Sequence, residues 1–424
     1  MTQNSSEWKE YRIDELGQVV TGHTPLKSVK EYYEGNDYTW IKPTDIRKGE
    51  RYVLETDEYY SQKAFEKYKK ALLPPLSTCV VTIGTVGEKI CLTHKPCFTN
   101  QSINAIIPNR EKFDPMFVYY LLKYNLDQVA QRNPGTASGR HHVSKSNISS
   151  IIVKAPTKST QLKISTILAR YDDLLENNTR RIRILEEMAQ AIYREWFVHF
   201  RFPGHEGVRM VESELGLIPE GWEVKPLSEY GQIVTGKTPS KVIDEYFGGS
   251  VPFIKIPDMH EGFFIINTGD TLSIKGERSQ KQKTLPPNSI CVSCIGTGGL
   301  VGITCKNSQT NQQINSIVLN NQNYREYLYF SLRMLKETII NYGLIGATMV
   351  NLNRQKFSSL IIVNPPQQMI IKYHQSVEDI FEQILLFKLK NQNLRQTRDL
   401  LLPKLISGEL DVSELDIIIP GAIT

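Results

Sequence analysis

Three short motifs in this sequence have residue types and spacings that other proteins use for catalysis or metal binding. Residues 231–238 (GQIVTGKT) match the phosphate-binding loop of nucleotide hydrolases, in which backbone amides and a lysine, here Lys237, hold the phosphates. Asn364-Pro365-Pro366 begins like the signature of adenine methyltransferases, in which an aromatic residue then stacks on the extruded base. Cys291 and Cys294 have the spacing of half a zinc site. Each motif needs a particular structural context.

The first two motifs lack that context. A phosphate-binding loop needs a flexible glycine loop after a strand and a helix directly after the lysine. Here residues 232–235 are themselves strand-like, and Pro239 follows. After Pro366 stands Gln367, which cannot stack on a base as an aromatic ring does. Both motifs are thus weak evidence for an enzyme. A nucleotide hydrolase using Lys237 or a methyltransferase using Asn364 is the alternative from a different functional class.

The metal-binding patterns are incomplete as well. Cys291 and Cys294 have no second pair at ligand spacing, so packing of small thiols in a core explains them better. His141 and His142 are adjacent, but no cysteine or carboxylate stands at the spacing of further ligands. No carboxylates group with a lysine as in a nuclease centre. We expect no catalytic residue, no metal and no cofactor.

The overall composition is that of an ordinary globular protein. The 424 residues include 40% hydrophobic and 22% charged residues, and the net charge is +5. A mildly basic chain permits nucleic-acid binding without requiring it, because a local basic face matters more than the total. The N-terminus lacks the features of a signal peptide, and no apolar run is long enough to cross a bilayer, so we expect a cytoplasmic protein. The six cysteines fall in strand-like segments and are predicted to be reduced.

The chain contains the same sequence pattern twice. Gly17-Gln-Val-Val-Thr-Gly22 returns as Gly231-Gln-Ile-Val-Thr-Gly236, and Leu-Pro-Pro, Ile-Gly-Thr, Thr-Asn-Gln and Ser-Ser elements then recur in the same order. The offset between matched residues drifts only from 214 to 209. Two half-molecules of one architecture therefore stand in tandem, joined near Gly204 and Trp222.

Each half is predicted to be a globule followed by a long helix. The first 150 or so residues of each half are short β-branched segments broken by Gly, Pro, Asn and Asp. Apolar residues then recur every three or four positions from Ile164 to Trp196 and from Ile370 to Leu405. Such helices most simply bury their apolar faces on each other, and an antiparallel pair would place the globules at opposite ends with approximate two-fold symmetry. Asn178 and Asn391 fall on these faces, where a buried amide fixes register; alternatively, residues 177–179 mark a local break.

This organisation resembles the specificity subunit of type I restriction-modification systems. The resemblance covers essentially the whole chain and rests on the tandem globules and helices, the phrase Glu214-Leu-Gly-Leu-Ile-Pro-Glu-Gly-Trp222, and the Gly-Thr and Asn-Gln elements of both halves. One departure is Thr160, where the family usually has an acidic residue before glutamine.

The resemblance implies a mixed α/β fold with two target recognition domains, whose helices form an antiparallel coiled coil. It also implies recognition of a bipartite, asymmetric DNA target, with methyltransferase subunits docked on the helices and endonuclease/translocase subunits added for restriction. A protein that only assembles these partners, without a DNA preference, is a further possibility. The expected boundaries are 1–157 and 206–366 for the recognition domains, and 158–205 and 367–424 for the helices with the C-terminal tail.

Two places in each half supply side chains that suit DNA. Arg and Lys suit guanine, Asn and Gln suit adenine, and Lys and Arg anchor phosphates. A solvated surface charge is the ordinary alternative for any one residue, but recurrence at matched positions favours contact for Lys42, Lys255, Lys145 and Arg354. Asn100-Gln101 and Asn311-Gln312 are better explained as turn residues than as base readers. The predicted DNA-binding residues are Lys42, Arg140, His141, His142, Lys145, Lys255, Arg354 and Lys356.

Overall fold

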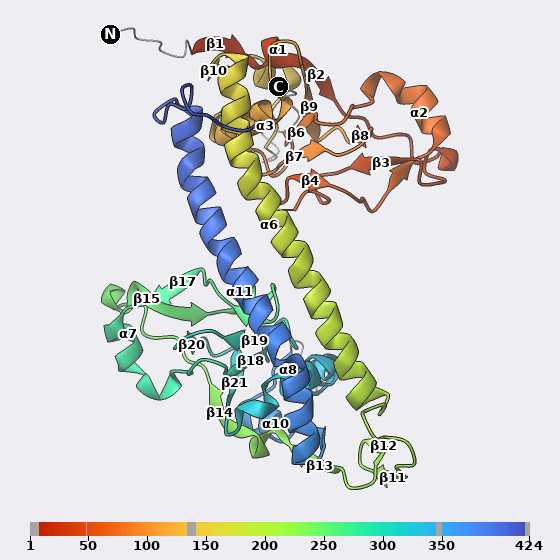
Figure 1. Cartoon of the computed structure of the whole chain (residues 1–424), viewed down its shortest axis with the longest axis vertical. Coiled ribbons are helices and arrows are strands. Elements are labelled where there is room, and N and C mark those ends of the chain that lie inside the picture. The colour runs from red at the N-terminus through yellow and green to blue at the C-terminus, as the bar shows by residue number, and fades with distance from the viewer. Residues whose placement is uncertain (1–7, 48, 134–140, 345–349, 420–424) are drawn as a thin grey trace. The chain divides into compact units, whose positions relative to one another are not determined.

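The computed structural model describes residues 8–47, 49–133, 141–344 and 350–419 and is divided into two compact units (Figure 1). The first unit comprises residues 1–177 and 391–424, and the second comprises residues 178–390. Each unit holds one globule and part of each of two long helices, α6 (Lys158–Tyr193) and α11 (Gln367–Ile406). The predicted mixed α/β fold, with two repeated globules each followed by a long helix, is confirmed.

The globule of the first unit is built on a five-stranded sheet with the order β2-β9-β6-β7-β4. The first three pairs of neighbours are antiparallel, and the last pair, β7 with β4, is parallel. The central strands are fully buried, which explains their near-continuous β-branched and apolar sequences. The strands are β2 (Gly17–Thr21), β4 (Tyr52–Val53), β6 (Thr78–Val81), β7 (Ile90–Thr93) and β9 (Ile103–Pro108).

Two smaller sheets and five short helices complete this globule. The order β5-β3-β8 forms a three-stranded sheet, and β1 pairs with β10, so the beginning and the end of the globule lie side by side just before α6. The strands are β1 (Lys9–Arg12), β3 (Tyr38–Ile41), β5 (Tyr59–Tyr60), β8 (Phe98–Thr99) and β10 (Ile152–Ala155). The helices are α1 (Ile13–Leu16), α2 (Gln62–Tyr68), α3 (Pro115–Tyr124), α4 (Leu126–Gln131) and α5 (Lys145–Ser149), with 3-10 turns η1 (Lys30–Tyr32) and η2 (Lys69–Ala71).

The globule of the second unit repeats this topology strand for strand. Its sheets have the orders β14-β21-β18-β19-β16, β17-β15-β20 and β13-β22, with the same parallel and antiparallel pairs. The strands are β13 (Glu223–Pro226), β14 (Gly231–Thr235), β15 (Phe247–Ile254), β16 (Phe264–Ile265), β17 (Asp270–Leu272), β18 (Ile290–Ser293), β19 (Val301–Thr304), β20 (Gln309–Thr310), β21 (Ile314–Leu319) and β22 (Ile361–Asn364).

The remaining elements of the second unit follow the same plan. A hairpin, β11 (Met210–Ser213) with β12 (Gly216–Pro219), precedes the globule. The helices are α7 (Ile274–Ser279), α8 (Arg325–Met334), α9 (Lys336–Leu344) and α10 (Arg354–Ser358). The 3-10 turns are η4 (Leu227–Glu229), η5 (Asp244–Tyr246), η6 (Ile256–Met259), η7 (Lys281–Lys283) and η8 (Gln322–Tyr324), and a π turn, η3 (Arg194–Val198), ends α6.

The duplication extends to single hydrogen bonds. Thr21 Oγ1 donates to Asn104 Oδ1 over 2.6 Å in the first globule, and Thr235 Oγ1 donates to Asn315 Oδ1 over 2.7 Å in the second. Each bond joins the end of the first sheet strand to its buried neighbour. The internal repeat predicted from the sequence is therefore a repeat of three-dimensional structure.

Within each unit the two long helices run antiparallel. In the first unit Asp172 of α6 is paired with Arg398 of α11 at 2.5 Å, and Lys163 Nζ donates to the carbonyl of Ser413. In the second unit the Arg181 guanidinium lies 5.6 Å from the Phe387 ring centroid, while the Tyr193 ring lies near Tyr373. The partner number falls as the α6 number rises, so the predicted antiparallel pairing is confirmed.

Asn178 and Asn391 are buried, as expected from their places on the apolar faces. The alternative of a local break at residues 177–179 is wrong, because α6 continues without interruption from Lys158 to Tyr193. Register control by the two amides stays a prediction.

All six cysteines are free, and five of them are buried, in agreement with the predicted core thiols. Across the part of the chain that the structure describes, we find no helix with the length and apolar character that a membrane span requires. The bounds of the four predicted segments stay a prediction.

Candidate nucleic-acid interface

Lys42 and Lys255 stand at matched positions, directly after strands β3 and β15. In each case the peptide N–H donates to an aspartate three residues later, Asp45 or Asp258, over 2.7 and 2.8 Å. The ammonium group of Lys42 pairs with Glu58 at 2.8 Å, and that of Lys255 pairs with Asp270. Partial burial would lower the pKa of Lys42, but the hydrogen bond and charge of Glu58 outweigh it and raise that pKa. Both lysines are thus already paired with a carboxylate.

The second predicted place is a polar segment before strands β10 and β22. His141, His142 and Lys145 are exposed in the first unit, and Arg354 and Lys356 are exposed in the second. Arg140 lies outside the described residues. The N–H of Gly84 donates to the His141 carbonyl over 3.0 Å, so this segment lies against the Ile83-Gly84-Thr85 motif.

The same arrangement recurs in the second unit. There the N–H of Gly296 donates to the Val350 carbonyl over 3.0 Å, and Ile295 forms a bridge with Asn351. Lys145 and Arg354 are the first residues of α5 and α10, which are capped by Ser144 and Asn353. Structure and sequence agree that these two cations are equivalent.

Arg354 also lines a shallow hollow of the second unit. The hollow lies beside the beginning of β14 and includes two amide side chains, Gln232 and Gln355. Arginine and glutamine are the side chains that read guanine and adenine by paired hydrogen bonds. Gln232 is not among the DNA-binding residues predicted from the sequence, where it stands in the phosphate-loop pattern and in the internal repeat.

The Asn-Gln motifs have the structural role expected of turn residues. Asn100 Oδ1 accepts from the Ser102 N–H over 3.0 Å, and Asn311 Oδ1 accepts from the Gln313 N–H over 3.1 Å. Gln101 and Gln312 accept from hydroxyls three residues after the first sheet strand, those of Thr24 and Thr238. The side-chain oxygens of both motifs are thus used within their own turns.

The catalytic motifs lie in ordinary structural settings. Residues 231–235 of the phosphate-loop pattern form strand β14, and a Cβ at Gly231 would collide with the Val318 carbonyl of the neighbouring strand. Asn364 ends strand β22, and its side-chain oxygen accepts from the Tyr230 hydroxyl over 3.0 Å. Among the described residues no three His, Cys, Asp or Glu side chains are grouped as metal ligands.

The structure points to four further lysines that the sequence analysis missed. Lys27 and Lys241 lie in the loops after β2 and β14, and Lys69 and Lys281 begin the turns η2 and η7 after α2 and α7. All four are exposed, and within the described residues none forms an ion pair. The numbers of the two pairs differ by 214 and 212, as the repeat requires. Comparison of the two halves alone would have found them.

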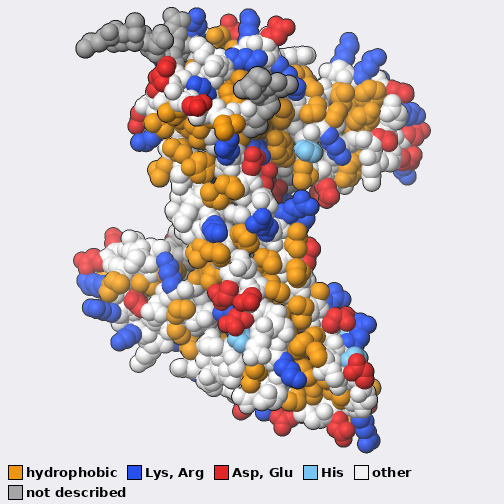
Figure 2. All heavy atoms as spheres, in the orientation of Figure 1, with side chains coloured by type: hydrophobic (Ala, Val, Ile, Leu, Met, Phe, Trp, Pro, Cys, Tyr) orange, Lys and Arg blue, Asp and Glu red, His pale blue; other side chains and the backbone are white. Residues whose placement is uncertain are grey.

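The loop and the helix that carry these lysines are in contact within each unit. In the first unit the His23 ring stacks on Tyr68 of α2 with centroids 5.8 Å apart. In the second unit Gln280 Nε2 donates to the Lys237 carbonyl over 2.7 Å. Figure 2 shows Lys and Arg side chains at the outer margin of both lobes, interspersed with acidic ones. In each unit the two exposed lysines therefore stand on segments that contact one another.

Comparison with known proteins agrees with this duplicated architecture. A family model described as Type I restriction modification DNA specificity domain matches residues 5–187 and again residues 219–394. The HindI type I restriction enzyme specificity subunit of Haemophilus influenzae is 35% identical over 368 residues, which cover 72% of this chain and 80% of that protein. The MjaIX specificity subunit of Methanocaldococcus jannaschii is 28% identical over 417 residues, 96% of this chain and 95% of that one.

A solved structure has the same fold. The crystal structure of the type I restriction-modification S subunit from M. genitalium has 16% sequence identity and a TM-score of 0.63, and the match covers 96% of this chain and 98% of that chain. With the family model matched once in each repeat, this chain belongs to the type I restriction-modification DNA specificity family, and it is a specificity subunit.

Proposed function

We propose that this chain binds double-stranded DNA with both globules, each reading one part of a bipartite target, and that it carries out no catalytic step itself. The observation that carries the proposal is the repetition of one recognition unit with matched exposed cations. Phosphate contacts by lysine position a protein on the duplex, whereas paired contacts to base edges specify the sequence. Because the two globules have diverged in sequence, the target need not be palindromic.

The exposed residues of both polar segments are the proposed base and phosphate contacts. They are His141, His142 and Lys145 in the first half, and Arg354 and Lys356 in the second. Arg140, which lies outside the described residues, is proposed as a further contact. We add Lys27, Lys69, Lys241 and Lys281 as phosphate contacts. Lys42 and Lys255 would have to exchange a carboxylate for a phosphate, so their removal should weaken binding less.

The chain is further proposed to position methyltransferase subunits on adenines of the target, and endonuclease subunits for restriction. Large apolar side chains are exposed along the helices, as Figure 2 also shows. Exposed apolar surface of this kind marks docking sites for other proteins. In the second unit they are Ile184, Met188, Leu386 and Leu389.

The DNA-binding proposal is tested by measuring affinity at several salt concentrations. A target is first selected from a pool of random-sequence duplexes. The double variants Lys27→Ala/Lys69→Ala and Lys241→Ala/Lys281→Ala should each lower the slope of log affinity against log salt by about 2, because each phosphate contact releases about one counterion.

Lys112→Ala is the matched control, since Lys112 is exposed but has Gln322 at the equivalent position of the second half. Its slope should equal that of the wild-type chain. A wild-type affinity that does not change with salt contradicts DNA binding through phosphates. Slopes that are unchanged in both double variants place the phosphate contacts elsewhere.

A further inference from the structure

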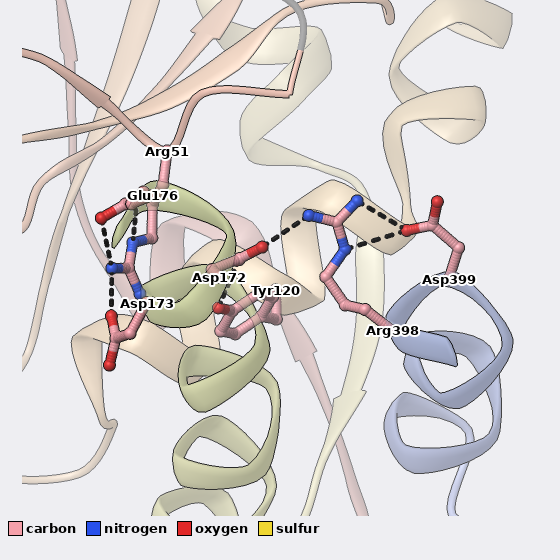
Figure 3. Close-up of polar contacts among 7 residues, drawn as sticks. All are labelled: Arg51, Tyr120, Asp172, Asp173, Glu176, Arg398 and Asp399. Atoms are coloured by element: carbon pink, nitrogen blue, oxygen red, sulfur yellow. Dashed lines mark hydrogen bonds and ion pairs between the residues drawn. The ribbon is translucent and has the colours of Figure 1, made fainter. Parts of the chain in front are cut away.

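A buried polar cluster fastens the first globule to both long helices of its unit (Figure 3). Asp172 of α6 accepts from the Tyr120 hydroxyl of α3 over 2.6 Å and from Arg398 of α11 over 2.5 Å. Arg51, just before β4, donates to Asp173 and Glu176 of α6 over 2.5 to 3.1 Å. We call Arg51, Tyr120, Asp172 and Arg398 the polar cluster.

The charged members of this cluster are almost fully buried. The side chains of Arg51, Asp172 and Arg398 are 5%, 5% and 7% exposed. A buried charge is costly unless it is paired and hydrogen-bonded, and bonds between a planar guanidinium and a carboxylate hold only one geometry. Burial would lower the pKa of Arg51, but the bonds to the α6 carboxylates keep it raised. These contacts are therefore directional and fix the angle between globule and helix.

The second unit has an aromatic cluster at the same four positions. Phe263 precedes β16 as Arg51 precedes β4, and their carbonyls accept the equivalent hydrogen bonds from Ile303 and Leu92. Phe330 stands in α8 where Tyr120 stands in α3, and Phe381 stands in α11 where Asp172 stands in α6. Ala189 of α6 corresponds to Arg398 of α11 and is also fully buried. We call Ala189, Phe263, Phe330 and Phe381 the aromatic cluster.

The aromatic cluster joins the second globule to α11 through packed rings instead of charged hydrogen bonds. Its ring centroids are 5.2 Å apart for Phe263 and Phe381, and 5.9 Å apart both for Phe263 and Phe330 and for Phe330 and Phe381. These contacts gain from burial and edge-to-face packing and leave no polar group to be satisfied. All four matched residues differ between the two clusters. A single replacement in either cluster would bury an unpaired charge or leave a cavity.

We propose that the polar cluster is a positioning site for DNA reading: it fixes the angle of the first globule on its helix pair and thereby the spacing of half-sites that the protein accepts. This inference rests on the proposed function. One base pair more or less between two half-sites rotates one of them by about 35° relative to the other, since a turn has 10 to 10.5 base pairs. A globule held at a fixed angle cannot bind the rotated half-site, whereas a globule that turns on its helices can bind it.

Arg51→Met tests this directly. It removes the hydrogen bonds of Arg51 to α6 and leaves that of Tyr120 to Asp172 in place. The carboxylates of Asp173 and Glu176 stay hydrated because they are 62% and 43% exposed. Folding should therefore survive. Arg47→Met is the matched control: Arg47 lies in the same loop with 79% exposure, and among the residues that the structure describes it pairs with Glu50 alone. The fourfold variant Arg51→Phe/Tyr120→Phe/Asp172→Phe/Arg398→Ala rebuilds the cluster as it is in the second unit.

The measurement is the affinity of the full chain for its selected target and for targets with one base pair inserted or deleted between the half-sites. We expect Arg51→Met to bind the selected target nearly as well as the wild type, but its preference over the altered spacings should fall about tenfold. Arg47→Met should keep the preference, and the fourfold variant should regain it at the old spacing or at one other spacing. A loss of stability alone would lower the affinity for the selected target and for both altered targets equally.

The outcomes separate the two proposals. A wild-type chain that selects no two-part sequence contradicts the proposed function, and the inference falls with it. A wild type that discriminates spacing, with Arg51→Met discriminating equally well, contradicts the positioning role alone. Should the fourfold variant fail to fold, the comparison of Arg51→Met with Arg47→Met still decides.

Discussion

Leu76 and Asn288 have the same left-handed backbone conformation, with φ of 65° in both. Each follows a Leu-Pro-Pro turn, and each peptide N–H donates over 2.8 Å to a strand carbonyl, that of Thr93 or Thr304. The conformation is costly for leucine because its Cβ approaches the following carbonyl, whereas asparagine tolerates it. The second repeat thus has the better residue at this turn.

Leu76→Asn is therefore expected to stabilise the first unit by about 1 kcal/mol, through relief of backbone strain. The measurement is the midpoint of urea unfolding, and Asn288→Leu should shift it in the opposite direction. A lower midpoint for Leu76→Asn would show that packing of the half-buried leucine outweighs the strain.

A second residue-scale feature is a buried carboxylate held by two cations in the second unit. Glu326 is completely buried and accepts from Arg325 and from His374 Nδ1, the latter over 2.7 Å. This hydrogen bond, opposed by burial and aided by the charge of Glu326, raises the pKa of His374 above its ordinary value of 6.5. The folded chain thus keeps a proton that the unfolded chain loses first.

Stability from His374 should be fully present below about pH 6.5 and should be lost as the pH rises through its higher folded pKa. Urea unfolding between pH 6 and pH 8 should show this decline in the wild type. In His374→Gln, which keeps a donor toward Glu326 but does not titrate, the decline should be smaller. Equal slopes in both proteins would assign the pH dependence to other groups.

For single residues, the sequence predicts well which positions of the two halves are equivalent. It predicts less well which contacts each side chain makes. The equivalence of Lys42 with Lys255 and of Lys145 with Arg354 is visible in the repeat. The carboxylates that pair with the first two, Glu58 and Asp270, stand at no spacing that identifies them as partners beforehand. The equivalence of Lys69 and Lys281 is visible in the repeat too, but nothing local in the sequence distinguishes a free surface lysine from a paired one.

At the scale of elements, the two long helices were the most predictable part of the fold. Their apolar positions recur at helical spacing, and buried residues of α6 and α11 correspond at one constant offset, as with Leu168 and Val377 or Leu175 and Ile384. The sheets could be predicted only as strand-rich segments. The parallel pairs β4 with β7 and β3 with β8 depend on contacts between distant segments of two to four residues, which carry no local signal.

The contact between α6 and α11 in the first unit yields a stability prediction. Arg398→Ala should lower the free energy of unfolding of this unit by about 3 kcal/mol or more, because Asp172 is left buried and without its cation. The double variant Asp172→Phe/Arg398→Ala should lose less than the sum of the two single variants. Additive losses in a double-mutant cycle by urea unfolding would show that the two side chains act independently.

At the scale of the whole molecule, the two globules share every sheet order and strand direction, yet differ in how each is fastened to its helices. A duplicated scaffold with divergent details suits a protein that reads two different sequences. The duplication of the strand order was implied by the sequence repeat. The sequence repeat did not imply that each long helix is divided between the two units. That division arises because residues 158–177 contact the C-terminal segment 391–419, so the two ends of the chain lie in one unit.

Exchange of one globule is the sharpest test of whether the two globules read DNA independently. Residues 222–365 are replaced by those of a relative with a different target, and the preferred duplex is selected again from a random pool. With independent globules, one half-site changes to that of the relative while the other half-site and the spacing stay the same. A change in both half-sites, or in neither, would contradict independent reading.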